Sequence, residues 1–325
     1  MTFRLLSHQA ISLTNRPAIE RMKTSNYRLQ CRDRELDLTG RAKIMGILNT
    51  TPDSFFNSGT FSAGSQKAGV DLAVERALEM IDEGADIIDI GGESTRPGAQ
   101  KVDAEEELRR TVPVIRELRR QSDILISIDT YKADVAEKAI LAGAQIVNDI
   151  SGFNFDPDIV EVCRRHNTAA ILMHTTGRPE NIKWSHETKT TGADIVTLVK
   201  TGLGASLKNA EKHGIRNIIL DPGFGFGKSV AENYTLLQRF RDLHVLGRPL
   251  LAGLSRKSFL GAALQLPGQP APPPGHRLTA TIAANTVAAI NGANILRVHD
   301  TKEAIEALAV ASYVIEPGSG LFQPS

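Results

Sequence analysis

The chain has 325 residues, 41% of them hydrophobic and 23% charged, which is enough for one large domain with an ordinary buried core. Its 38 basic and 37 acidic residues leave a formal net charge of +1, so nothing global indicates a nucleic-acid or membrane partner. It has two cysteines and no CxxC spacing, which argues against a disulfide framework and a cysteine metal site.

Residues 1–26 precede the first regular pattern. They contain Arg4, Arg16, Arg21 and Lys23 but one acid, Glu20, and no continuous apolar run. A secretory signal is therefore not expected, and a transit peptide is a weaker alternative to a flexible extension. No apolar run approaches the roughly 20 residues of a membrane span. We expect a cytoplasmic protein.

The chain then alternates short apolar runs with longer amphipathic ones. Residues 27–39 show partial alternation typical of a short hairpin. The runs that follow are apolar throughout, as in parallel strands covered on both faces. The predicted strands are 43–48, 86–90, 124–128, 145–147, 169–173, 217–220, 249–253 and 294–298.

Stretches with helical spacing of apolar residues separate these strands. The predicted helices are 70–83, 105–120, 133–141, 158–165, 193–212, 231–240, 278–291 and 302–314. Eight strand–helix units predict an α/β fold, a single-domain (β/α)₈ TIM barrel over residues 27–318 with a short N-terminal hairpin or extension. The proline-rich stretch 266–275 must be a loop, and 319–325 is a predicted C-terminal tail.

Polar residues follow nearly every predicted strand. In a (β/α)₈ barrel the strand C-termini meet at one mouth, where the active site forms. Helix capping explains some of these residues but does not explain amides, carboxylates and cations at every strand. The residues at successive strand ends are Asn49, Asp89, Asp129, Asn148, His174, Asp221, Lys257, Arg297 and His299.

These polar residues suggest two chemical zones. Arg297 and His299 are two apart on one strand, so they face the same side, and together with Arg96 they suit a phosphate. Carboxylate and amide side chains on other strands, such as Asp129 and Asn148, can accept paired N–H bonds from the edge of a heterocycle. The mouth is therefore predicted to bind a heterocycle that carries a phosphate or diphosphate.

Three motifs of known nucleotide-binding or catalytic sites are incomplete or absent in the sequence. The stretch GFGFGKS at 223–229 resembles a phosphate-binding loop, but the required first glycine is replaced by Pro222. No HExxH metal motif and no GxSxG nucleophile elbow occurs in the sequence.

The motifs around the strand ends resemble those of the bacterial dihydropteroate synthase family over about residues 27–316. They read MGILNTTPDSF at 45–55, DIIDIGGESTRPG at 86–98, SIDT at 127–130, NDIS at 148–151, LMHTTGRP at 172–179, LDPGFGFGK at 220–228, LSRKSFLG at 254–261 and ILRVHD at 295–300. Each motif alone is moderately specific, and their shared order makes the resemblance strong.

The resemblance implies a transferase of folate synthesis. Such an enzyme condenses 6-hydroxymethyl-7,8-dihydropterin diphosphate with p-aminobenzoate, SN1-like, to give 7,8-dihydropteroate and diphosphate. It also implies Mg²⁺ as cofactor, small-molecule substrates, no nucleic-acid or membrane partner, a homodimer, and a p-aminobenzoate site that sulfonamides target.

The resemblance assigns residues to three subsites. The implied pterin contacts are Asp89, Asp129, Asn148, Asp221 and Lys257. The implied diphosphate contacts are Asn49, Arg96, Arg297 and His299, with Asn49 also the Mg²⁺ ligand. The implied p-aminobenzoate contacts are Phe55, Pro97, Phe226 and Ser258.

Two alternatives stay open, and one of them depends on a departure from the family pattern. Residues 54–59 read SFFNSG where the family commonly has SFSDGG, so Asn57 replaces an aspartate in the first mobile loop. A non-catalytic pterin-binding paralogue is therefore an alternative. A methyl-folate:corrinoid methyltransferase is another, although that enzyme needs no diphosphate site and the cations Arg96 and Arg297 count against it.

Overall fold

The computed structural model of the protein describes residues 27–51 and 63–315. The strands are β1 (Arg28–Cys31), β2 (Arg34–Asp37), β3 (Lys43–Asn49), β4 (Ile87–Gly91), β5 (Leu125–Asp129), β6 (Ile146–Asp149), β7 (Ala169–Met173), β8 (Ile218–Asp221), β9 (Leu251–Ala252) and β10 (Ile295–Val298). The α-helices are α1 (Ala63–Asp82), α2 (Ala104–Gln121), α3 (Ala133–Ala142), α4 (Ile159–His166), α5 (Ile195–Lys212), α6 (Val230–Gln238), α7 (Ser258–Ala263), α8 (Leu278–Ile290) and α9 (Thr301–Ile315). Three 3₁₀ helices complete the set: η1 (Pro179–Asn181), η2 (Phe240–Leu246) and η3 (Pro274–His276).

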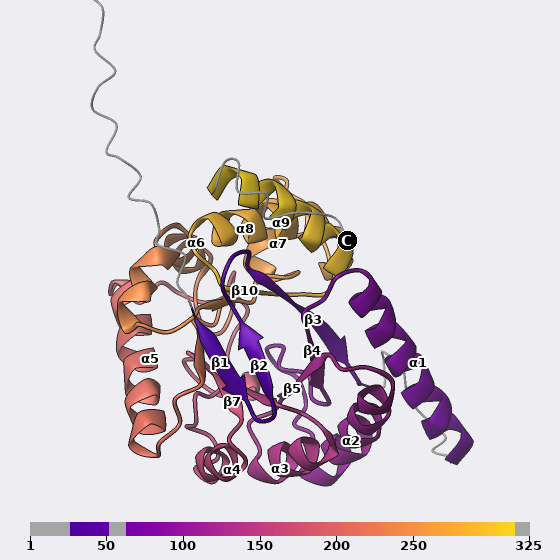
Figure 1. Ribbon diagram of the computed structural model, residues 1–325. Coiled ribbons are helices and arrows are strands. Elements are labelled where there is room, and N and C mark those ends of the chain that lie inside the picture. Colours follow the sequence, from indigo (N-terminus) through magenta and orange to yellow (C-terminus); the bar gives the residue numbers. More distant parts are fainter. Residues whose placement is uncertain (1–26, 52–62, 316–325) are drawn as a thin grey trace, which may run out of the picture.

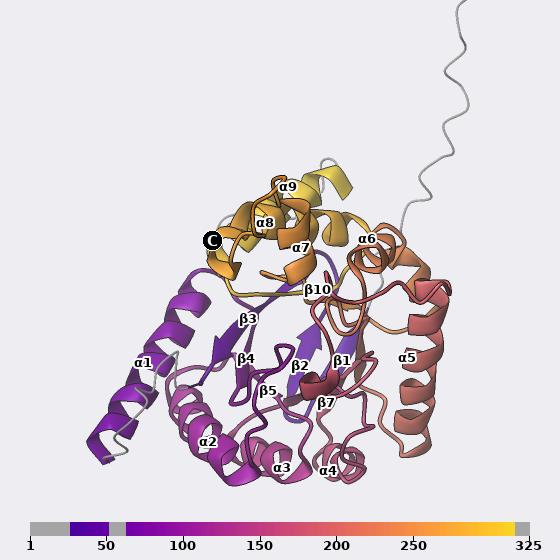
Figure 2. The same cartoon turned by 180° about the vertical axis from the view of Figure 1, so that it is seen from behind.

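Strands β3 to β10 form one parallel barrel. Their hydrogen-bonded order is β8-β7-β6-β5-β4-β3-β10-β9. The two end strands meet through a parallel bridge between Leu220 and Leu250, and Leu220 N donates to Pro249 O at 2.9 Å. The helices surround this barrel (Figures 1 and 2). The predicted (β/α)₈ barrel and its N-terminal hairpin are confirmed. None of the described helices is long and apolar enough to cross a membrane.

The barrel strands separate two apolar cores because alternate side chains point to opposite faces. On β3, Ile44 and Leu48 pack outward in the core beneath the helices, and Met45 packs inward. The hairpin β1–β2 adds Leu29 and Leu36 to the inner core, so it plugs the end of the barrel opposite the mouth. The barrel residues of this inner core are Met45, Ile87, Leu125, Ile146, Ala169, Ile171, Ile219, Leu251 and Ile295.

Element boundaries differ from prediction at several places. The strand predicted at 249–253 is shorter in the structure, where β9 contains only Leu251 and Ala252. One reason is that Pro249 has no N–H to donate to a neighbouring strand. The helix predicted at 231–240 ends at Gln238 and is followed by η2. Helix α7 was not predicted, because its six residues are too few to show a helical period. Residues 1–26 and 319–325, predicted as terminal extensions, lie outside the described residues.

Candidate active site

The polar residues at the strand ends share one layer of the barrel interior. Asp89 lies two residues after the interior Ile87, and Asp221 lies two residues after the interior Ile219. Residues two apart on a strand face the same side, so these side chains point into the barrel one step closer to its mouth. Alternation assigns this layer to Ile47, Asp89, Ser127, Asn148, Met173, Asp221, Gly253 and Arg297.

Arg297 joins carboxylates from two other strands. Its Nε donates to Asp89 Oδ2 at 2.6 Å, and its Nη2 donates to Asp129 Oδ2 at 2.6 Å. Asn148 Nδ2 donates to the same Asp89 oxygen at 3.0 Å. Burial acts to lower the pKa of Arg297, but the two carboxylates raise it above its ordinary value. The acidic and cationic zones, predicted as separate, therefore meet at this arginine.

Asp129 keeps one acceptor for a ligand. Its Oδ1 is buried and has no hydrogen-bond partner among the described residues, while the side chain lines the cavity at the mouth. Burial raises the pKa of Asp129 to about 7, with Arg297 acting in the opposite direction. A buried carboxylate oxygen without a partner is costly, so a ligand N–H placed there would be held firmly.

Asp221 and Lys257 form a second buried acid and base. Asp221 Oδ1 accepts from Gly223 N at 2.7 Å, and burial raises the pKa of Asp221. Burial also lowers the pKa of Lys257 to about 8, so Lys257 is largely protonated at pH 7. Its Nζ lies 4.2 Å from the centroid of the Phe226 ring, a cation–π contact on the cavity wall.

A cavity of about 430 Å³ lies at the mouth of the barrel. Three predicted pterin contacts, Asp89, Asn148 and Asp221, do not line this cavity and lie buried in the barrel layer. Phe55 and Asn57 lie outside the described residues. The predicted site residues that line the cavity are Asn49, Arg96, Pro97, Asp129, Phe226, Lys257, Ser258, Arg297 and His299.

His299 is neutral rather than cationic. Burial lowers the pKa of His299 to about 3, and the charges of Arg256 and Arg297 act in the same direction. Its Nδ1 lies 2.9 Å from Ser255 Oγ. A neutral imidazole can still donate one N–H to an anion, so His299 adds a hydrogen bond to the cavity rather than a charge.

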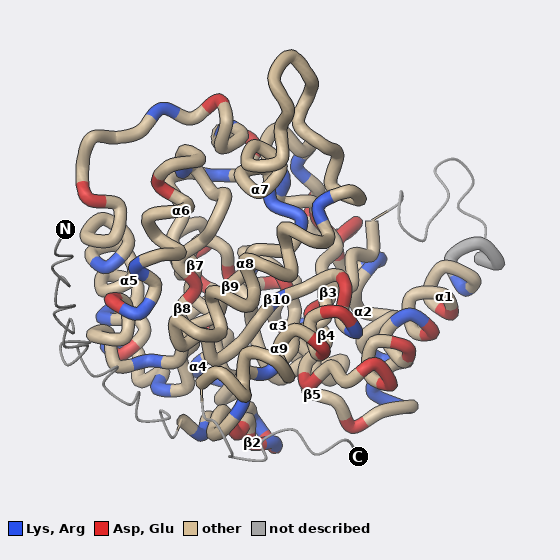
Figure 3. Tube along the Cα trace, turned by 90° about the horizontal axis from the view of Figure 1, so that it is seen from above, with Lys and Arg blue, Asp and Glu red and all other residues tan. Residues whose placement is uncertain are grey.

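The cavity wall also contains residues that sequence reasoning missed. Trp184, the single tryptophan, lies in the long connection from β7 to α5 and shows no pattern that could have placed it. Arg256 adjoins Lys257 in the SRK motif, and Figure 3 shows Lys and Arg positions gathered beside α7. Arg277 follows the proline-rich loop, and its Nη1 donates to Arg256 O at 2.9 Å. The mouth therefore contains two arginines that were not predicted, of which Arg256 forms an ion pair with Asp300.

Side chains suited to a metal are sparse. Within residues 27–51 and 63–315, no group of three or more His, Cys, Asp or Glu could hold a metal ion. Asn49 ends β3 on the cavity wall, beside the layer that holds Arg297. Its amide oxygen is a ligand type that Mg²⁺ accepts when substrate phosphates and water supply the others.

The geometry above agrees with comparison to known proteins. The family model described as "Pterin binding enzyme" matches residues 45–299. The chain belongs to this family. The match begins within β3 and ends at His299, so it covers the strand ends that surround the cavity.

Members of this family with assigned functions are similar over most of their length. The dihydropteroate synthase of Synechocystis sp. is 44% identical over 273 residues, which are 83% of this chain and 89% of that protein. The structure of Xanthomonas albilineans dihydropteroate synthase with 4-aminobenzoic acid is 40% identical with a TM-score of 0.77, covering 90% of this chain and 99% of that one. The same enzyme in complex with 7,8-dihydropteroate is 37% identical with a TM-score of 0.75, covering 89% and 99%.

Proposed function

We infer that the protein catalyses dihydropteroate synthesis, in which 6-hydroxymethyl-7,8-dihydropterin diphosphate and p-aminobenzoate give 7,8-dihydropteroate and diphosphate. The observation that carries this inference is the meeting of Asp129, Lys257 and Arg297 at one cavity of about 430 Å³. The cavity suits a heterocycle with N–H donors and an attached anion. Similar proteins are dihydropteroate synthases, and their structures contain 4-aminobenzoic acid or 7,8-dihydropteroate.

The carboxylate side of the cavity, together with Asp221 in the barrel layer, would hold the pterin. Asp129 Oδ1 and the Asp221 carboxylate can accept from the amino and ring N–H groups of a pterin, and Lys257 can donate to its carbonyl or ring nitrogen. Asn148 donates to Asp89, and Asp89 accepts from Arg297, so these two residues orient Arg297. This side of the cavity is rich in carboxylates, which favours positive charge developing on the pterin.

The cations at the mouth would hold the diphosphate. Arg96, Arg297 and the N–H of His299 can donate to its oxygens. The bond between the pterin methylene carbon and the diphosphate oxygen breaks, and its electron pair leaves with the diphosphate. The arylamine nitrogen of p-aminobenzoate then bonds to that carbon and loses a proton to solvent. Fixed cations beside the leaving group stabilise the charge that develops there.

The arylamine would lie between the loops on the other side of the cavity. Phe226 is 7% exposed and is fixed by packing against Ile182 and Met173. Pro97 and Ser258 line the same cavity, the latter at the start of α7. Phe55 is proposed to complete this subsite from the first loop. An aromatic and a proline ring suit the flat face of p-aminobenzoate.

Asn49 is proposed as the protein ligand of Mg²⁺. It would bind the ion through its amide oxygen, while the diphosphate and water supply the remaining oxygens. When bound, Mg²⁺ neutralises part of the diphosphate charge.

We propose a homodimer formed through α8 and α9, which pack side by side (Figure 1). Val310, Tyr313 and Val314 on α9 are 64%, 55% and 60% exposed, which is unusual for apolar side chains on one helix. Replacing Val310 by Asp should convert a dimer into a monomer in sedimentation velocity. Val245→Asp is the matched control, since Val245 is 77% exposed on η2. A wild-type protein that sediments as a monomer would refute the dimer.

A cytoplasmic location is also proposed. Cys31 and Cys163 are buried free thiols. Reduced cysteines of this kind are typical of reducing compartments.

The inference has a direct test. Purified protein mixed with the pterin diphosphate, p-aminobenzoate and Mg²⁺ should release diphosphate and form dihydropteroate in equal amounts. Omitting p-aminobenzoate should abolish dihydropteroate formation. Tight pterin binding without turnover would instead support the non-catalytic alternative.

A further inference from the structure

The loop between β4 and α2 carries Arg96 and Pro97 to the cavity, although Arg96 itself is exposed. An exposed side chain acts on a ligand only as accurately as its backbone is held. Glu93 stands at the base of this loop, lines the cavity, and has a side chain only 7% exposed. Its carboxylate therefore needs partners inside the protein.

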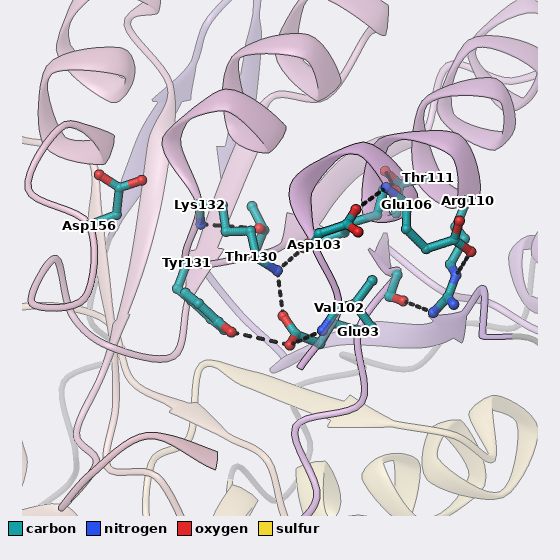
Figure 4. Close-up of polar contacts among 12 residues, drawn as sticks. Glu93, Val102, Asp103, Glu106, Arg110, Thr111, Thr130, Tyr131, Lys132 and Asp156 are labelled. Atoms are coloured by element: carbon teal, nitrogen blue, oxygen red, sulfur yellow. Dashed lines mark hydrogen bonds and ion pairs between the residues drawn. The ribbon is translucent and has the colours of Figure 1, made fainter. Parts of the chain in front are cut away.

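Glu93 finds these partners on two other segments (Figure 4). Lys132 Nζ lies 2.5 Å from Glu93 Oε2 and also bonds to the Glu107 carboxylate on α2. Tyr131 OH donates to Glu93 Oε1 at 3.2 Å, and Val102 N donates to the same oxygen at 2.9 Å. One buried ammonium group is thus shared between two buried carboxylates, whose side chains are 7% and 1% exposed.

The backbone at the base of this loop also packs closely against α2. Arg110 Nη1 donates to Gly92 O at 2.8 Å. A Cβ at Gly92 would lie 2.9 Å from both Glu107 Cγ and Thr111 Cγ2, so a larger residue would have to displace these α2 side chains. The start of the loop is therefore fixed relative to Glu107.

Lys132 lies on the segment that also carries Asp129. Strand β5 ends at Asp129, and Lys132 precedes α3 three residues later. The ammonium group therefore ties the Arg96 loop to the end of the strand whose carboxylate pairs with Arg297. Lys132 and Glu107 do not line the cavity, so they act on a ligand only through these neighbours.

We propose that Glu93, Lys132 and Glu107 form a positioning network that sets the affinity for the diphosphate by holding the Arg96 loop against the end of β5. The proposal rests on the proposed function for the identity of the anion. Lys132 and Glu107 are positioning residues, and the loss of either should affect the diphosphate end of the substrate more than the pterin end.

Lys132→Met tests the proposal. The KM for the pterin diphosphate and the Kd of inorganic diphosphate, measured by calorimetry at constant Mg²⁺, should each rise at least tenfold. The Kd of the diphosphate-free 6-hydroxymethyl pterin should stay within twofold. Lys132→Arg keeps the cation and should recover most of the diphosphate affinity. Lys67→Met is the matched control, because Lys67 forms an exposed ion pair with Asp71 on α1.

A second variant covers the case in which Lys132→Met does not fold. Lys132→Met combined with Glu107→Gln removes one cation and one anion, which leaves the buried net charge unchanged. This double variant should fold and still bind diphosphate at least tenfold more weakly. Unchanged diphosphate affinity in either folded variant would overturn the proposal, as would an equal loss of affinity for the diphosphate-free pterin.

Failure of the proposed function would be seen separately. A wild-type protein that binds inorganic diphosphate but forms no dihydropteroate would refute the function and leave the binding test of the network intact. A wild-type protein that binds no diphosphate at all would overturn the network proposal.

Discussion

Asp129 combines a buried position, an ion pair with Arg297 and a carboxylate oxygen that has no hydrogen-bond partner among the described residues. Its raised pKa of about 7 means that the carboxyl gains a proton as the pH falls through neutrality. Protonation would remove an acceptor from the proposed pterin site. Affinity for 6-hydroxymethyl pterin should therefore fall by about tenfold from pH 8 to pH 6, because the ionised fraction falls by about that factor.

Calorimetric titration at several pH values measures this effect. Asp129→Asn is the control, since its amide does not titrate and its profile should keep only the change that comes from Lys257, whose pKa is about 8. A wild-type profile that matches that of the variant would contradict the assignment of Asp129 to the pterin.

Arg297 and Arg96 should behave differently when replaced. Arg297→Ala leaves Asp89 and Asp129 without their cation, so it should lower the free energy of unfolding by about 3–5 kcal/mol as well as weaken diphosphate binding. Arg96 is exposed, so Arg96→Ala should raise the KM for the pterin diphosphate with little change in stability. Urea unfolding and steady-state kinetics separate the two effects. Equal stability of the two variants would show that the buried ion pairs are not as described.

Strand alternation made part of the site predictable at the residue level. Asp89 and Asp221 follow apolar residues by two positions, and eight such strands can share only one mouth. The pairing of Arg297 with two carboxylates was not predictable, because it depends on distances across the barrel that no local pattern contains. Trp184 and Arg277 were missed for a related reason, since irregular loops deliver both to the cavity.

Helix α6 supports the loop that carries Phe226, a residue of the proposed arylamine subsite. Ser229 caps it in a capping box with Glu232, and Asn233 Oδ1 on the same helix accepts from Gly225 N at 2.7 Å in the loop that carries Phe226. Ser229→Ala should lower the free energy of unfolding by about 1 kcal/mol, the usual cost of a lost N-cap. Gln238→Ala at the exposed end of α6 is the control. Thermal or urea unfolding with no difference between the two variants would contradict the capping role.

Long amphipathic helices and apolar strands were the elements that the sequence predicted well. Helix α2 illustrates why, since Asp103 accepts from Glu106 N at 2.8 Å and acidic residues fill its first turn while Arg119 and Arg120 fill its last. Short helices such as α7 were not predicted, because six residues span too few turns to show a helical period. Strand β9 was overestimated because its apolar run continues through residues that pack in the core without strand pairing.

At the scale of the whole molecule, the barrel converts eight separate strand ends into one binding site. The hairpin β1–β2 and the inner apolar core fill the other end of the barrel. Asp129, the cations Arg96, Lys257 and Arg297, and the aromatic ring of Phe226 line one cavity of about 430 Å³. The account depends on one substrate spanning these groups, with its pterin in the buried layer and its diphosphate at the cations.

A crystal structure of the protein with the pterin diphosphate and Mg²⁺ tests this arrangement most directly. The account predicts the pterin edge against Asp129 and Asp221, with the diphosphate oxygens within hydrogen-bond distance of Arg96, Arg297 and His299. A pterin bound outside the barrel layer, or a diphosphate that contacts none of these three residues, would contradict it.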